Sequence, residues 1–382
     1  MRNNKKILYL AGFIFSLPIA LTSYINSSFL EGYLGEKYVG YIYIVASILT
    51  IWWMLKMPKI LSRFGNIYTA IIFLSVNFLT LIIMAFTTNI YLIILSFILF
   101  FISINFLFTC FDIFVEDASE STSVGKLRGL FLMFVNLAWV FAQLVSGSII
   151  NKSSFKGIYL LASSFVFLLL IIIIFGFKKF KDPKYTKVSV LKTIKVFLKN
   201  KNISKIYLIN LILKLFFAWM VIYIPIYLYE YMNFSWKEIG LIFTIMLIPF
   251  VLLDYPLGRL SDKIGEKKIL IFGFLITIFF TFLIPFINDP IIWLWAIILF
   301  GTRIGAATIE VMSEGYFFKE IKEKNADEVS FFRNTYPMSY LLAPIVAIPT
   351  LIIVPSLEYL FFVVVIFLII GFAISLRIKD IK

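Results

Sequence analysis

Three charged side chains recur on one face of a predicted helix in the last third of the chain. Glu310 and Glu314 follow Arg303 by 7 and 11 residues. At 100° per residue, both offsets return to within about 20° of the arginine's direction. An arginine can hold a carboxylate or a phosphate through two parallel hydrogen bonds, and a carboxylate can form an ion pair or carry a proton. The stripe is therefore suited to binding an anion or to forming ion pairs.

Two cations lie deep within apolar runs. Lys214 and Arg303 fall about 10 and 13 residues into their runs, and we expect no carboxylate at that depth. An anionic ligand such as a carboxylate, phosphate or sulfonate would suit such a pair. Alternatively, Lys214 pairs with Asp254 or another acidic residue. Further candidate binding groups, all of lower specificity, are Asn105, Asn136, Gln143, Asn210, Trp139 and Trp219.

Composition defines the environment of these residues. Of 382 residues, 62% are hydrophobic and 15% are charged, and the mean hydropathy is +0.99, which fits a polytopic membrane protein. The net charge of +14 comes from loops beside membrane segments, so nucleic-acid binding is not expected. A single cysteine and no histidine leave few ligands for a metal. We therefore expect no metal and no cofactor.

Twelve apolar runs have roughly the 20 residues needed to cross a bilayer. They predict an all-α integral membrane protein with twelve transmembrane helices. The first run is long and has no small-residue cleavage site, so it is expected to be a retained helix. The predicted spans are 7–30, 38–56, 67–87, 90–112, 127–150, 156–177, 204–230, 237–256, 268–287, 290–313, 331–353 and 356–376.

Lysine and arginine are distributed unevenly between alternate loops. The segments on the side of the amino terminus hold 28 of the 35, and the opposite loops hold 4. This bias predicts a multi-pass protein of the cytoplasmic (inner) membrane with both termini in the cytoplasm. The basic stretch from Lys178 to Lys205 separates six spans from six. We therefore expect bundles at 1–177 and 204–382, joined by a cytoplasmic linker at 178–203.

The two halves carry matching polar residues at a constant offset, which indicates an internal duplication. The first half has a neutral residue where Arg303 stands, and Lys214 corresponds to Phe15 or a neighbour. The second half therefore has two cations, Arg303 and Lys214, where the first half has neutral residues. Adding 198 takes Asn105, Asp112, Glu116 and Asn136 to Arg303, Glu310, Glu314 and Asn334.

A second repeat, at an offset of 200, lies in two charged loops. Residues 258–268 read G-x-x-x-D-K-x-G-x-K-K, formed by Gly258, Asp262, Lys263 and Gly265 with two further lysines. Residues 58–65 repeat this pattern in weakened form, with Arg63, Gly65 and a serine in place of the aspartate. The pattern resembles the cytoplasmic signature loop of the major facilitator superfamily (MFS), which joins the second and third helices of each six-helix half.

This resemblance implies an MFS transporter of the 12-helix type: two parallel, pseudo-symmetric six-helix bundles that rock around a substrate site near the middle of the membrane. It also implies a monomer that moves a small molecule. In that family, ion pairs close the cytoplasmic side, with the loop aspartate at the start of the eleventh helix. The corresponding gating residues here are Asp262, Arg259, Lys263, Gly258, Gly265, Arg63, Asp112, Glu116, Glu310, Glu314 and Arg333.

Two departures from the family pattern leave alternatives open. The first loop lacks the aspartate, and the fifth span lacks the Gly-Pro motif of many drug exporters, with Ala138, Ala142 and Ser146 there instead. A drug or multidrug efflux transporter, a polytopic membrane enzyme and a lipid scramblase are the other hypotheses. There is no G-x-x-x-x-G-K-[ST] loop for ATP. Coupling to H⁺ or another ion is open; with no histidine, protons would need Asp112, Glu310 or Asp254.

Overall fold

The computed structural model describes residues 5–118, 124–178, 180–182, 199–320, 331–354 and 356–379, and every regular element in these ranges is a helix. The helices of the first half are α1 (Lys5–Ser23), α2 (Asn26–Leu34), α3 (Glu36–Met54), α4 (Met57–Phe86), α5 (Ile90–Ala118) and α6 (Val124–Gly176). Those of the second half are α8 (Lys201–Ile226), the π-helix η1 (Tyr227–Tyr231), α9 (Trp236–Ile264), α10 (Glu266–Leu283), the 3₁₀-helix η2 (Ile284–Phe286), α11 (Ile292–Glu320), α13 (Thr335–Ile353) and α14 (Tyr359–Ser375).

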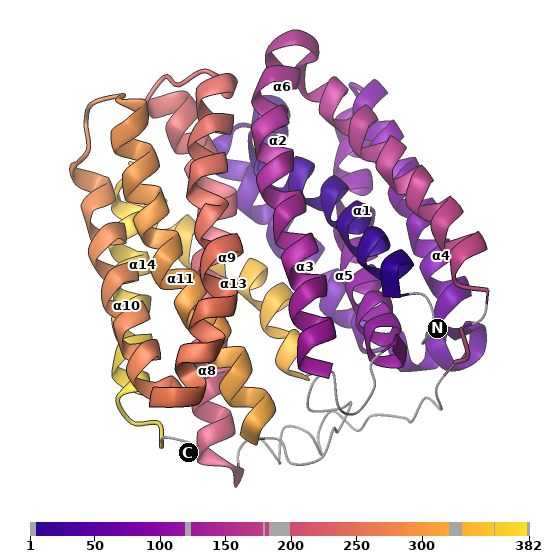
Figure 1. The fold of residues 1–382 in the computed structure, drawn as a ribbon. Coiled ribbons are helices and arrows are strands. Elements are labelled where there is room, and N and C mark those ends of the chain that lie inside the picture. Colours follow the sequence, from indigo (N-terminus) through magenta and orange to yellow (C-terminus); the bar gives the residue numbers. More distant parts are fainter. Residues whose placement is uncertain are drawn as a thin grey trace. The chain divides into compact units, whose positions relative to one another are not determined.

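Ten helical segments of the described ranges are long and apolar enough to cross a membrane. One of them, Met133–Gly176, has 44 residues and covers most of two predicted spans. Ser154 has a φ of 56° within α6, and Figure 1 shows this helix reversing direction there. The 17-residue helix α14 is shorter but apolar, and it lies within the last predicted span. The all-α membrane fold predicted from the sequence is therefore confirmed.

Contacts between residues divide the chain into two compact units. Unit 1 comprises Met1–Lys187 with Ser235–Gly240, and unit 2 comprises Val188–Phe234 with Leu241–Lys382. In unit 1, α6 packs on α1 and α4, and α5 packs on α3 and α4. Gly147 of α6 lies so close to the backbone of Trp236 that any side chain there would collide with it.

In unit 2, α8 packs on α11, α13 and α14, while α10 packs on α11 and α14. Glycines allow the closest of these contacts. A methyl group on Gly305 of α11 would lie 2.5 Å from the carbonyl oxygen of Gly273 on α10. Small residues bring helix backbones together in this way where lipid provides no hydrophobic drive for association. This packing holds α11 against its neighbours, and α11 carries the predicted charged stripe.

Candidate substrate-binding site

An ion pair joins α8 to α11 inside unit 2. The Nζ atom of Lys214 lies 2.5 Å from Oε1 of Glu310, and the two side chains are 14% and 28% exposed. Lys214 therefore has an acidic partner, as the alternative interpretation stated; that partner is Glu310, and the expectation that no carboxylate reaches Lys214 is wrong. Helical spacing placed Glu310 on the same stripe as Arg303, and the packing of α8 on α11 brings Lys214 to that stripe.

Arg303 of α11 is buried against α8, at 1% exposure. Its guanidinium carbon lies 5.2 Å from the ring centre of Phe216 and 5.5 Å from that of Phe217. The Nζ atom of Lys214 lies 5.3 Å from the ring centre of Phe217. The ring of Phe217 thus faces both cations, and the negative face of an aromatic ring attracts each of them. Lys214 and Arg303 thus share Phe217 as a neighbour.

Neutral groups of α8 extend this cluster along the helix. The side-chain amide of Asn210 donates to Oγ1 of Thr335 at 2.8 Å, and Asn210 itself is buried. Trp219 is fully buried, its ring centre lies 5.7 Å from that of Tyr223, and its Nε1 has no hydrogen-bond partner among the described atoms. Asn200 caps the start of α8 by accepting from the N–H groups of the second and third residues after it. This cap fixes where the helix carrying the cluster begins.

The candidate residues of unit 1 make structural hydrogen bonds. Asn105 donates to the carbonyl of Phe101 on its own helix at 2.8 Å, and Gln143 of α6 donates to the carbonyl of Ala20 on α1 at 2.7 Å. Both side chains are buried, and Asn136 is half-buried on α6. The described bonds of Asn105 and Gln143 serve the packing of unit 1, and their binding role stays a prediction.

Two of the predicted gating carboxylates, Glu310 and Glu314, form ion pairs in the described part of the chain. Arg333 donates from Nη1 to Oε1 of Glu314 at 2.7 Å, which links the residues before α13 to α11. Glu310 contacts Lys214 of α8, so its described partner lies outside the signature loop. Arg63, Arg259 and Lys263 are exposed, Asp112 is partly buried, and Gly258 has open space around it. The side chains of Glu116 and Asp262 lie outside the described part.

Both signature loops turn at a glycine in the left-handed region. Gly65 has a φ of 75° and Gly265 a φ of 84°, so a side chain at either position would be strained. Each glycine starts a long helical stretch, which explains why the spacing predicted two equivalent loops.

Two carboxylates beside these turns were missed by the sequence reasoning. Oδ1 of Asp182 accepts the backbone N–H of Asn66 at 2.6 Å, and Oε1 of Glu266 accepts from Nζ of Lys319 at 2.6 Å. Asp182 contacts the first residue after Gly65, and Glu266 is the first residue after Gly265. Each carboxylate thus lies at the N-terminus of a helix, which attracts negative charge. In the second half, Glu266 directly follows the glycine in the sequence, so the sequence alone could have predicted a carboxylate at this helix start. In the first half, the acid comes from the linker.

Comparison with known families agrees with this architecture. The family model of the Major Facilitator Superfamily matches residues 8–334 and 216–380. The chain belongs to the Major Facilitator Superfamily. Membership in the Major Facilitator Superfamily and the apolar helices make it a multi-pass integral membrane protein of transporter type.

Two curated relatives share part of this Major Facilitator Superfamily chain. The multidrug efflux pump SdrM of Staphylococcus aureus (strain N315) is 24% identical over 193 residues, covering 50% of this chain and 40% of that protein. The uncharacterized MFS-type transporter MJ1560 of Methanocaldococcus jannaschii is 26% identical over 172 residues, covering 43% and 44%. The chain thus aligns with less than half the length of each relative.

A solved structure covers nearly all of this facilitator chain. The crystal structure of the nucleoside transporter NupG aligns with a TM-score of 0.77 at 13% identity, over 99% of this chain and all of that one. At this identity the likeness shows the fold.

Proposed function

We propose that the protein is a secondary transporter that moves a small anionic solute by alternating access. One observation supports the substrate class: Lys214 and Arg303 converge on the ring of Phe217. Lys214 is already paired with Glu310, so an anion that displaced this carboxylate would bring its own negative charge to the ammonium group and to Arg303. The planar fork of Arg303 suits a carboxylate or phosphate, and Lys214 supplies a point charge.

The ion pair with Glu310 suggests how the solute is exchanged. A bound anion would compete with Glu310 for the ammonium group of Lys214, because both are negative and the two side chains are only partly exposed. Protonation of Glu310 would remove its charge and release Lys214. A proton and an anion would then enter the site together, which is symport. The ion pair re-forms when both have left.

Uptake into proteoliposomes with a panel of organic carboxylates, phosphates and sulfonates tests the substrate class. Arg303→Lys keeps the charge but loses the planar fork, and Lys214→Ala removes the charge. Both should raise the KM for the best anion about tenfold, which corresponds to losing one charge-assisted contact. The matched control is Lys201→Ala, an exposed lysine at the start of the same helix. It should transport as the native protein does.

The alternative is a multidrug efflux transporter, and the named relative SdrM supports it. If the two variants transport anions normally, or if the protein prefers organic cations, the efflux hypothesis replaces the anion hypothesis. Coupling is tested separately with an imposed pH gradient. Uptake by the native protein should respond to the gradient, and uptake by Glu310→Gln should not.

Gating residues form a further part of this proposal. We propose that Arg333–Glu314 and Lys319–Glu266 hold the ends of the unit 2 helices together in one state of the cycle and separate in another. Their described distances of 2.7 and 2.6 Å support a closed pair in each case. The count of lysine and arginine supports placing these ends, and both termini, in the cytoplasm.

A further inference from the structure

A cluster of indoles and cations marks the junction of α3 and α4 in unit 1. We define it as the indole–lysine patch: Trp52, Trp53, Lys56, Lys59 and Arg63. The Nζ atom of Lys56 lies 3.2 Å from the ring centre of Trp52 and 5.5 Å from that of Trp53. The two indoles are 49% and 39% exposed and meet edge to face at 5.3 Å. The ammonium group is therefore held in place over an exposed aromatic surface.

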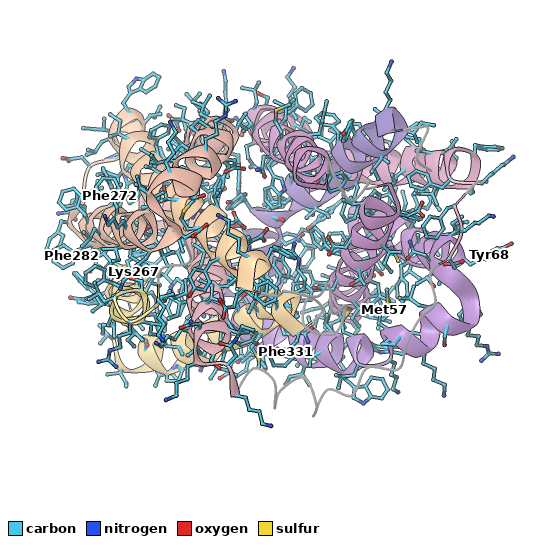
Figure 2. All side chains as sticks on the ribbon, turned by 60° about the horizontal axis from the view of Figure 1, so that its bottom comes forward. Met57, Tyr68, Lys267, Phe272, Phe282 and Phe331 are labelled. Carbon is cyan, nitrogen blue, oxygen red and sulfur yellow. The ribbon has the colours of Figure 1, made fainter. Side chains whose placement is uncertain are left out.

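The first turns of α4 present the remaining cations in the same direction. Lys56, Lys59 and Arg63 lie within about 60° of one another at 100° per residue. Met57 and Leu61 are buried on another side of the same turns. Figure 2 labels Met57, the first residue of α4, and Tyr68 further along the same helix. All five residues of the patch are exposed, and the three cations share one side of these turns.

The patch carries a net positive charge that its own sequence does not balance. No aspartate or glutamate occurs between Lys37 and Phe111. The carboxylate of Asp182 accepts the backbone N–H of Asn66, beyond the turn glycine. An anion outside the protein would therefore meet three cations.

The second half has no counterpart of this patch, although its loop also carries lysine and arginine. At the offset of 200, the positions of Trp52, Trp53 and Lys56 hold Leu252, Leu253 and Pro256. The second loop also carries two acidic residues of its own. Since the duplication would have supplied equal loops, the indoles and the extra lysine are a feature of unit 1 alone.

We propose that the indole–lysine patch is a binding site for the phosphate headgroup of an anionic phospholipid. Indole rings favour the level of the lipid headgroups, and lysine and arginine donate charge-assisted hydrogen bonds to phosphate. The neighbouring surface is apolar and exposed: Ile48, Leu55 and Phe64 are 52%, 52% and 43% accessible. That surface suits acyl chains, which a free, hydrated anion does not have. The occupant is therefore a lipid.

Quenching of tryptophan emission by brominated phosphatidylglycerol tests the proposal. The full-length protein is reconstituted in phosphatidylethanolamine vesicles with rising fractions of the brominated lipid. Trp52→Phe/Trp53→Phe defines the share of the emission that comes from the patch. That share should be quenched to saturation at a low mole fraction. In Lys56→Gln/Lys59→Gln, the half-saturating fraction should rise tenfold or more, since each cation near a membrane surface changes binding about fivefold.

Lys267→Gln/Lys268→Gln is the matched control, because it removes two lysines from the second loop, which has no indole. It should leave the half-saturating fraction unchanged. The proposal is overturned if native quenching simply follows the bulk fraction of brominated lipid, or if the control variant loses as much as the patch variant. Brominated phosphatidylcholine, which has no net charge, should give no saturation; saturation with it would mean that the indoles alone determine the contact.

Discussion

Lys214 and Glu310 bond α8 to α11 within unit 2, with 2.5 Å between Nζ and Oε1. Both residues lie on membrane-spanning helices, and neither side chain is more than 28% exposed. An unpaired charge in such a place is expensive, so each residue stabilises the fold by satisfying the other. The same bond must open if the site is to bind an anion through Lys214.

Glu310→Gln should lower the stability of the protein. It leaves the ammonium group of Lys214 partly buried without its carboxylate, which costs about 1–3 kcal/mol, between the values for exposed and fully buried pairs. The midpoint temperature of unfolding in detergent measures this. The charge swap Lys214→Glu/Glu310→Lys should recover part of the loss, and a swap no better than the single variants would argue against a stabilising bond.

Gly65→Ala and Gly265→Ala should each be destabilising by about 1 kcal/mol, because both residues have a positive φ. Gly65→Ala should be worse, since the added methyl group would also collide with the carboxylate of Asp182. Gly258→Ala is the control, as it lies within α9 with no atom near its Cβ position. It should be neutral or slightly stabilising. Equal midpoint temperatures for all three variants would contradict the conformational argument.

Asp182→Ala should weaken the start of the helix at Asn66. Loss of a capping acceptor costs about 1 kcal/mol. Asp182→Asn should cost less, because the amide oxygen can still accept the N–H of Asn66. Hydrogen exchange at the amide of Asn66 measures this directly. The exchange rate should rise from the native protein to Asp182→Asn and again to Asp182→Ala. The exposed neighbour provides the reference: Lys181→Gln should exchange like the native protein.

Arg333 and Glu314 should be coupled in a double-mutant cycle. Their side chains are 33% and 19% exposed, so we expect a coupling energy of about 1 kcal/mol. Arg333→Gln, Glu314→Gln and the double variant are compared by their unfolding midpoints. Additive losses would show that the pair contributes nothing beyond its separate contacts.

The sequence predicted the transmembrane spans and the charged stripe, but not the contacts between helices. Run length was enough to locate the spans, and helical spacing placed Arg303 and Glu310 on one stripe. The sequence could not identify Lys214 as the partner of Glu310, because the periodicity of α11 does not tell which neighbouring helix packs against the charged stripe. The approach of Asp182 to Asn66 joins residues 116 positions apart through tertiary packing alone. Glu266 could have been found, since it directly follows the turn glycine.

Cys110 is the sole cysteine of the chain and is completely buried in unit 1, where its carbonyl accepts from the side chain of Asn66. A thiol-reactive dye therefore meets no target on the folded protein. Labelling during heating would report the opening of unit 1 specifically. Any cysteine introduced elsewhere on the surface would be the only site modified, so labels can be attached without first removing native thiols.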